Sequence, residues 1–359
     1  MTTYYVGSGG NDANNGLTWA LRKLTLNGAE DIPVAAGDTV YVGAGIYREL
    51  LTCDVAGANG NPITYIGDTD GSHTDLAGGM VRVTGSDNDQ AASRDHCVTG
   101  SVNYRAFSGF VLDGATYYQF EAPDPDNWTI SKCAIIGPYS SDYAALYLGG
   151  GANHLVQDCL IYGHVLVFHW AQVSDRNTTF ERCVITAGAK GLNVSQVGGI
   201  TVRNCLILGQ GAYGVAVDNL ISGQTVTVNN CIITNCATGL WALTEGEIIE
   251  DYNALAGCAT ARYRVAVGDH SNSYLWLPDL RWWFELVSGK GRMLSPFDLA
   301  SYSQLINVAG TSPPSTDARG TAVIGDQREW GPLEYDSSLD IAGGSVGAVS
   351  ISPGRGDLG

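Results

Sequence analysis

The chain has 359 residues, of which 45% are hydrophobic and only 15% are charged, so it holds ample material for a core. Its formal net charge of −17 disfavours binding to nucleic-acid phosphates, and no stretch reaches the roughly 18 apolar residues of a membrane span. Its 47 glycines follow no Gly-X-Y period, which excludes a collagen-like structure. We therefore expect short strands and tight turns, with neither nucleic acid nor membrane as a partner.

Residues 1–36 are predicted to cap the N-terminal end of the fold. Tyr4, Tyr5 and Val6 read as a strand, without the basic start or apolar run of a secretory signal. We expect a turn-rich loop over Gly7–Gly16 and a short helix over Thr18–Asn27. Such a cap would cover the exposed strand edge that otherwise invites aggregation.

A repeat of about two dozen residues runs through the middle of the chain. Five segments share the order apolar, polar, polar, cysteine, any residue, isoleucine, and Phe110 takes the cysteine slot one turn earlier. The cysteines are separated by 26, 24, 22 and 26 residues and are Cys133, Cys159, Cys183, Cys205 and Cys231. We expect them to form a structural ladder of buried, reduced thiols rather than disulfides or metal ligands.

Two consecutive outward residues before each cysteine indicate a corner, because a straight strand alternates strictly. Asn and Asp, frequent in these pairs, tolerate the left-handed backbone that corners often need. A second strand begins eight or nine residues after its cysteine, at Gly191, Gly214 and Gly239. Three strands per turn predict an all-β, three-sided, single-stranded parallel β-helix of about ten coils over residues 37–260. Leucine-rich and helical repeats do not fit these spacings.

Several motifs near the start resemble a known family. They are Tyr4–Val6, Gly9–Asp12, Gly37–Val42, Gly45–Glu49 and Gly60–Tyr65, and towards the end Glu250–Asn253, Ser303–Asn307 and Gly331–Tyr335. Together they resemble the right-handed β-helix proteins of the pectate-lyase-like superfamily. This resemblance implies a right-handed helix and a closing segment over residues 261–336. Residues 337–359 fall outside the family pattern, and their glycine-rich sequence predicts a tail or arm. Enzymes, adhesins and virion proteins share the fold, so it implies no single function.

Candidate catalytic residues can be named for a polysaccharide lyase. Such an enzyme needs a base beside a uronate carboxylate and a group that neutralises it. Lys190, Arg176 and His164 are weak candidates for these roles, with Arg182 as a substitute for Arg176. Wall packing is the alternative interpretation of His164 and of its neighbour His169. We expect no metal and no cofactor.

Acidic pairs, threonines and tryptophans offer further candidates, each with a structural alternative. Loop acids at Asp87, Asp89, Asp124 and Asp126 could serve a glycosidase but are usually solvated. Thr179, Thr201 and Thr227 are expected to form one outward column. Weak candidates for binding a sugar or a protein are Trp241, Trp276, Trp282 and Trp283, although the stretch over Trp276–Phe284 could equally pack over the last coil.

The function that we predict is a non-catalytic structural protein of a bacteriophage-type virion: a surface decoration, fibre, tail spike or other tail component. It would be made in the host cytoplasm, released by lysis, and assembled with other virion proteins or with itself, a trimer being favoured. Contact with a host glycan fits this role. The alternative is a polysaccharide lyase or glycoside hydrolase, with an extracellular or cell-surface location.

Overall fold

The computed structural model describes residues 1–31, 34–74, 78–137, 143–173, 176–186, 188–209, 211–220, 222–251 and 253–265. The expectations for Trp276, Trp282, Trp283, most of the closing segment and the glycine-rich tail lie outside these residues. Neither helix of the described part has the length and apolar character needed to cross a membrane.

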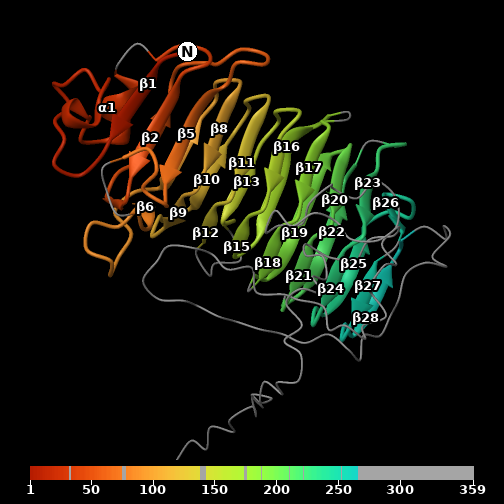
Figure 1. Cartoon of the computed structure of the whole chain (residues 1–359). Helices are drawn as coiled ribbons and strands as arrows, with labels where there is room; N and C mark the ends of the chain where they lie inside the picture. The colour runs from red at the N-terminus through yellow and green to blue at the C-terminus, as the bar shows by residue number, and fades with distance from the viewer. Residues whose placement is uncertain are drawn as a thin grey trace, which may run out of the picture.

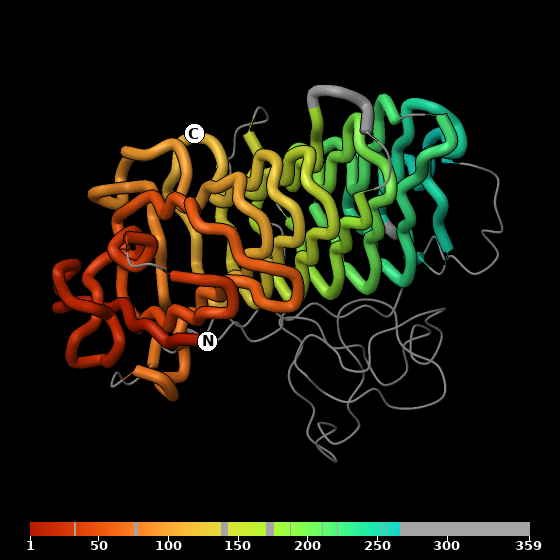
Figure 2. Tube along the Cα trace, turned by 90° about the horizontal axis from the view of Figure 1, so that it is seen from above, coloured from red at the N-terminus to blue at the C-terminus, as the bar shows by residue number. Residues whose placement is uncertain are grey.

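The described strands wind into three parallel sheets that form the walls of a rod (Figures 1 and 2). Sheet A contains β1 Thr3–Val6, β2 Thr39–Gly43, β5 Ile63–Asp68, β8 Arg105–Ser108, β11 Trp128–Ser131, β14 Leu155–Gln157, β17 Thr178–Glu181, β20 Ile200–Arg203, β23 Val226–Asn229 and β26 Ile248–Asp251. Sheet B contains β3 Gly45–Tyr47, β6 Val81–Thr84, β9 Val111–Asp113, β12 Ala134–Ile136, β15 Leu160–Tyr162, β18 Val184–Thr186, β21 Leu206–Leu208, β24 Ile232–Thr234 and β27 Ala254–Ala256. Sheet C contains β4 Leu51–Cys53, β7 His96–Gly100, β10 Tyr118–Ala122, β13 Leu146–Leu148, β16 Val165–Val173, β19 Lys190–Val197, β22 Tyr213–Asp218, β25 Thr238–Ala242 and β28 Thr260–Tyr263.

The fold prediction is confirmed. Sheet A has ten strands, sheets B and C have nine each, and every strand pair is parallel. Each turn of the helix contributes one strand to each sheet. The number of strands per sheet therefore counts the turns and is close to the expected number of coils. A single apolar core runs along the inside of the rod from Tyr4 to Leu255.

The corners between sheets A and B depend on one backbone conformation. The second outward residue of each corner pair has φ between 51° and 55°, in the left-handed region. These residues are Lys132, Asp158, Arg182, Asn204 and Asn230. Repetition of this turn after β11, β14, β17, β20 and β23 keeps these coils in register, so inward side chains lie above one another.

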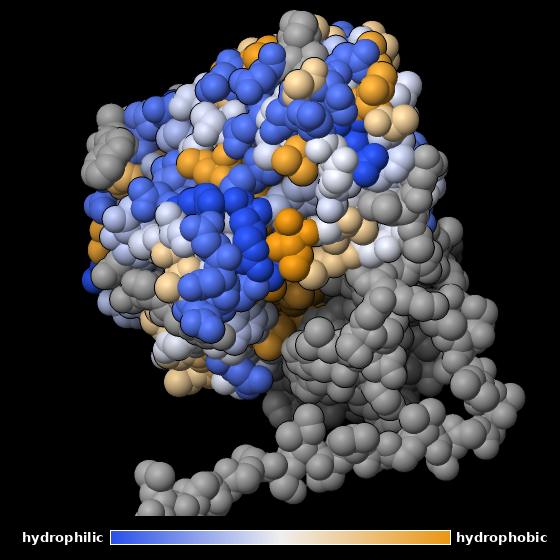
Figure 3. All heavy atoms as spheres, turned by 90° about the vertical axis from the view of Figure 1, so that its left-hand side faces the viewer, coloured by the Kyte–Doolittle hydropathy of each residue, from blue (hydrophilic) through white to orange (hydrophobic). Residues whose placement is uncertain are grey.

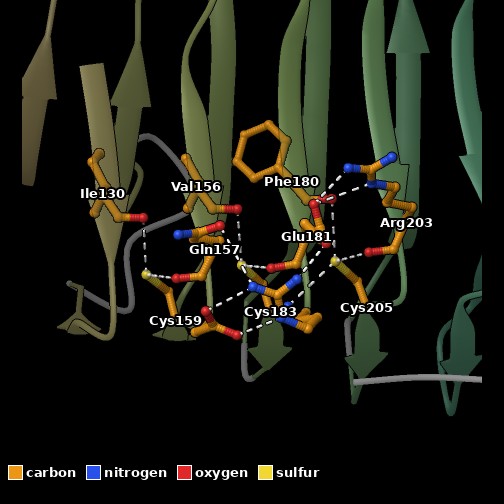
Figure 4. Close-up of polar contacts among 11 residues, drawn as sticks. Ile130, Val156, Gln157, Cys159, Phe180, Glu181, Cys183, Arg203 and Cys205 are labelled. Carbon is orange, nitrogen blue, oxygen red and sulfur yellow. Dashed lines mark hydrogen bonds and ion pairs between the residues drawn. The ribbon is translucent and has the colours of Figure 1, made fainter. Parts of the chain in front are cut away.

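The cysteine ladder lies just past these corners, and all five side chains are buried. Figure 4 shows three of them, Cys159, Cys183 and Cys205. Four of the five thiols, those of Cys159, Cys183, Cys205 and Cys231, point back one turn: Cys183 Sγ donates to the carbonyl of Val156 at 3.4 Å, and Cys205 Sγ to that of Phe180 at 3.6 Å. Backbone bonds follow the same step, as from Val184 N to Cys159 O at 2.8 Å. The thiols thus fill this core position as small, weakly polar groups in five successive turns.

Outside the ladder, an ionic network ties neighbouring corners together (Figure 4). Glu181 accepts hydrogen bonds from Arg203 at 2.7 Å and from Arg182, which also binds Asp158 at 2.7 and 2.9 Å. Arg182 is therefore part of the wall.

Asn253 takes the cysteine slot one turn after Cys231. Its Oδ1 accepts from Cys231 N at 2.9 Å, and its Nδ2 donates to Val228 O at 2.7 Å and to buried Glu250 at 2.8 Å. Arg262 pairs with the same carboxylate at 2.7 Å. Polar groups thus replace the thiol where the ladder of the described turns ends.

The expected helix over Thr18–Asn27 is wrong. Thr18 caps only a 3₁₀ turn, η1 Trp19–Leu21, because Lys23 then pairs with β1 through Lys23 N to Tyr5 O at 2.8 Å. Asp12 accepts from the amide of Thr25, and a short helix, α1 Leu26–Glu30, follows with Thr25 as its N-cap. A strand pairing thus divides the helical segment in two.

The cap is anchored in the rod by a buried ion pair. The carboxylate of Glu30 accepts from Arg105 at 2.7 and 2.6 Å and from the Tyr65 hydroxyl at 2.5 Å, and the Arg105 side chain is fully buried. Burial alone would lower the pKa of Arg105, but its hydrogen bonds to Glu30 raise it above the usual value. Figure 3 shows this end of the rod, which presents a largely hydrophilic surface.

Replacing Glu30 with Gln should reduce the free energy of unfolding by about 3–5 kcal/mol, because Arg105 would keep a buried, uncompensated charge. Urea unfolding measures this change. The control is Asp89→Asn at a half-exposed ion pair with Arg48, which should cost less than about 1 kcal/mol. Equal losses in the two variants would contradict the anchoring role.

The thiols should differ sharply in reactivity. Burial raises the pKa of Cys53 and Cys97 to about 12 and that of Cys183 well above its usual value. The hydrogen bond with Cys236 lowers the pKa of half-buried Cys258 to about 7. At pH 8 an aromatic disulfide reagent should therefore label Cys258 first, since the thiolate is the reactive form.

Peptide mapping after a short reaction identifies the labelled residue, and Cys258→Ser should abolish the fast phase. Rapid labelling of Cys183 in the folded protein would contradict the buried ladder.

Candidate functional site

The outward face of sheet C collects most of the uncommitted polar and aromatic side chains of the described turns. Side chains alternate along each strand, so residues paired across the sheet stack in columns. Inward columns such as Val98, Phe120 and Leu146 are buried in the core. The main outward column is Thr52, Thr99, Glu121, Tyr147, Leu166, Asn193, Ala216, Trp241 and Tyr263.

A group of stacked rings, which we name the tyrosine cluster, occupies the N-terminal half of this face. Its members are His96, Tyr117, Tyr118, Tyr143 and Tyr147. The Tyr118 ring is sandwiched between Tyr147 at 4.8 Å and His96 at 5.8 Å, with interplanar angles of 20° and 8°. The faces of Tyr118 are covered by its neighbours, and Tyr147 is buried with 8% of its surface exposed, whereas Tyr117, Tyr118 and Tyr143 are half-buried.

A carboxylate completes this surface. Glu121 accepts a hydrogen bond from Thr99 Oγ1 at 2.7 Å, and His96 Nε2 lies 3.3 Å from the same oxygen. Burial, then the charges of neighbours including Glu121, raises the pKa of Tyr118, and likewise that of Tyr147 to about 12. Both phenols are therefore neutral near pH 7. Within the described part of the chain, neither hydroxyl has a hydrogen-bond partner.

Two of the three candidate catalytic residues lie together. Lys190 begins β19, and His164 immediately precedes β16, the neighbouring strand. Burial and, second, the charge of Lys190 lower the pKa of His164 to about 4, so its ring is neutral near pH 7. Lys190 forms no ion pair with any described residue, and Asn193 on the same strand has a buried Oδ1 without a partner there.

Arg176, the third candidate, lies near the C-terminal end of β19, whereas Lys190 lies at the N-terminal end of this strand. The Arg176 amide bonds to Gly198 O at 3.0 Å, past the last residue of β19, whereas Lys190 is the first. Eight strand residues at about 3.3 Å each separate the two positions by roughly 25 Å. Arg176 instead lies near His154, whose pKa falls to about 4 through burial, with Arg176 adding to the shift. One site cannot use both Lys190 and Arg176.

Trp241 belongs to a second aromatic group near the C-terminal end of the face. Its ring lies 5.1 Å from Tyr213 and 6.2 Å from Tyr263, with an interplanar angle of 5° to the latter. The Arg264 guanidinium covers Tyr263 at 5.3 Å from the ring centroid. The remaining tryptophan candidates lie beyond the described residues.

Three of the candidate loop acids have structural partners. Asp87 pairs with Arg94 at 2.7 Å and Asp89 with Arg48 at 2.5 Å, while Asp126 accepts from Ala152 N at 2.7 Å. Asp124 is more exposed, with Gly150 N at 3.2 Å and His169 at 3.8 Å.

Thr179, Thr201 and Thr227 share an outward column on sheet A, as expected. The column continues through Thr129, Thr64, Thr39 and Thr3 with Ala106 and Leu155 between them. Threonine suits an exposed strand, so the column needs no ligand to explain it.

One group of potential metal ligands was not foreseen. Oxygen or nitrogen atoms of Asp68, Asp70 and His73 lie within 4.8 Å of one another in the loop after β5. The Asp68 carboxylate already accepts from the amides of His73 and Thr74 and from the Thr74 hydroxyl at 2.6–3.0 Å. These hydrogen bonds hold the loop in a turn around the Asp68 carboxylate, which explains why the three side chains lie together.

Sequence reasoning also missed the tyrosine cluster. Tyr117 and Tyr143 are 26 residues apart, one repeat of the cysteine period, and this spacing was the available signal. Tyr118 and Tyr147 are offset by loop residues between the coils, so their stacking could not be read from spacing alone.

The histidines should make stability depend on pH. Folded His154 and His164 remain neutral down to about pH 4, whereas the unfolded chain takes up protons below about 6.5. The free energy of unfolding should thus fall as pH drops from 6.5 to 4, by up to about 3 kcal/mol per histidine. The double variant His154→Asn, His164→Asn should lose this part of the pH dependence in urea unfolding at pH 7 and 4.5. An unchanged slope would contradict the assignment.

Comparisons with known proteins agree with this architecture. The pattern described as "right handed beta helix region" matches residues 103–258, and no curated protein matches the sequence. Pectate lyase Pel9A is similar in structure, with a TM-score of 0.59, 14% identity, and coverage of 94% of this chain and 97% of that one. XylC in complex with xylose gives a TM-score of 0.51 at 12% identity, covering 74% and 68%, and a rhamnogalacturonan lyase gives 0.50 at 13%, covering 77% and 87%. At these identities the likeness concerns the fold: the chain is a right-handed parallel β-helix with a pectate-lyase-like architecture.

Proposed function

We propose that the protein is a non-catalytic structural component that contacts a glycan through the outward face of sheet C. One observation carries the proposal: the neutral phenols of Tyr118 and Tyr147 have no hydrogen-bond partner among the described residues and lie near the Glu121 carboxylate. A phenol both donates and accepts hydrogen bonds, and a carboxylate accepts them, which suits the hydroxyl groups of a sugar. The stacked rings are already immobile, so binding costs little side-chain entropy.

The arrangement of candidate bases supports a binding role over a catalytic one. A general base works best when its pKa lies near the operating pH, and a pKa of about 4 makes His164 a weak base at neutral pH. Arg176 is too far from Lys190 to neutralise the carboxylate of a uronate from which Lys190 removes the neighbouring proton. Lys190 would therefore have to perform both roles.

A polysaccharide lyase or glycoside hydrolase is the second candidate function. It is favoured by Lys190, which forms no ion pair with a described residue, and by the buried Oδ1 of Asn193 on the same strand, which has no partner there, since such groups often mark a ligand site.

The setting that we propose is a bacteriophage-type particle, in which the protein would serve as decoration, fibre or tail component, with a trimer favoured. A continuous core and a pinned N-terminal cap suit a rigid rod exposed to proteases. Mass spectrometry of purified particles tests this setting, and absence of the chain from them would overturn it.

Removing the phenol hydroxyls should weaken glycan binding without disturbing the fold. Tyr118→Phe and Tyr147→Phe keep the ring stacking but lose hydrogen bonds worth about 1 kcal/mol each, or roughly fivefold in affinity. Affinity electrophoresis in gels containing polysaccharide measures the loss. The matched control is Tyr162→Phe on sheet B, which should leave mobility unchanged; equal effects at Tyr118 and Tyr162 would contradict a site on sheet C.

The enzyme alternative predicts new chain ends. Incubation with uronate-containing and neutral polysaccharides should produce neither unsaturated products, detected by ultraviolet absorbance, nor reducing ends. Product formation that is lost in Lys190→Met would establish the alternative and overturn the non-catalytic role.

A further inference from the structure

We infer that the glycan bound at the tyrosine cluster is a neutral, hydroxyl-rich chain rather than a polyuronate. The inference rests on the proposed function, because it specifies the ligand of the same site. It comes from the balance of charge around Tyr118 and Tyr147, and from the distance between this cluster and Lys190, which forms no ion pair with a described residue.

The charges beside the cluster are negative. Glu121 is the neighbour of Tyr147 in the same outward column, and Asp124 follows the end of β10 with its side chain 69% exposed. His96, which could carry a positive charge when protonated, already lies 3.3 Å from Glu121. Within the described residues, no arginine or lysine pairs with Glu121 or Asp124.

The positive charges lie elsewhere. Arg94 pairs with Asp87 at 2.7 Å. Lys190 lies two strands from Tyr147 and three from Tyr118, which at about 4.8 Å per strand amounts to roughly 10–14 Å. This separation of the strands exceeds the screening length of about 8 Å at physiological salt, so the attraction of Lys190 for a carboxylate bound at the cluster is weakened.

These charges select between two classes of sugar. A neutral sugar can donate its hydroxyl hydrogens to Glu121 and exchange hydrogen bonds with the phenols, and a bond to a charged acceptor is stronger than a neutral one. A uronate would bring its carboxylate against Glu121 and Asp124, beside which the described residues place only the imidazoles of His96 and His169 and no lysine or arginine. The net charge of −17 adds to this repulsion along the whole rod.

The test measures binding of the full-length protein to two neutral polysaccharides, xylan and a mixed-linkage β-glucan, and to two polyuronates, polygalacturonate and alginate. Affinity electrophoresis is run at 0.15 M salt with EDTA, so that divalent cations cannot bridge carboxylates. We expect retardation by at least one neutral chain and none by the polyuronates. Glu121→Gln should weaken neutral binding about five- to tenfold, whereas the matched variant Glu245→Gln, on an exposed corner after β25, should have no effect.

The possible results distinguish an error in the class of glycan from an error in the glycan site itself. Polyuronate binding in EDTA that equals or exceeds neutral binding, and is lost in Tyr118→Phe, would overturn the neutral class and leave the glycan site standing. Retardation by none of the four chains would overturn both. Neutral binding that is unaffected by Glu121→Gln but lost in Tyr118→Phe would also overturn the charge argument.

Discussion

The structure depends on the in-register parallel pairing of successive coils. Because each strand hydrogen-bonds to the strand one turn away, a residue is fixed less by its sequence neighbours than by residues about two dozen positions before and after it. The left-handed residue after each of the strands β11, β14, β17, β20 and β23 restores the register at these turns. Any side chain that fits the core at one turn therefore recurs at the next, and the cysteine ladder is the clearest example.

The same constraint builds the outer surface. Stacking that places Cys159 beneath Cys183 also places Glu121 beside Tyr147 and Trp241 beside Tyr263 on the outside of sheet C. A surface of this kind consists of columns in which successive side chains lie about 4.8 Å apart. It suits an extended ligand that crosses several strands, which is one reason to consider a polymer rather than a small molecule. The pinned cap, through Glu30 and Arg105, keeps the first turns of this surface from fraying.

Much of the core could be predicted from the sequence, because thiols at a constant spacing leave an unambiguous signal. The corner residues were also foreseeable from Asn and Asp, although Lys132 and Arg182 adopt the same conformation without that preference. The predicted helix over Thr18–Asn27 does not form because Lys23 pairs with a strand residue seventeen positions before it. This tertiary contact overrides the local helix propensity. The candidate site could be predicted from the sequence even less well. Lys190 and His164 are neighbours only because β19 lies beside β16, and Arg176 is distant only because β19 is long.

A structure of the protein with a bound neutral oligosaccharide tests the central claim most directly. The account predicts sugar hydroxyls within hydrogen-bonding distance of the Tyr118 and Tyr147 phenols and of Glu121, with the chain running across the strands of sheet C. A sugar bound instead on sheet A or sheet B, or one held at Lys190 and Asn193 without contact to the tyrosine cluster, would contradict it.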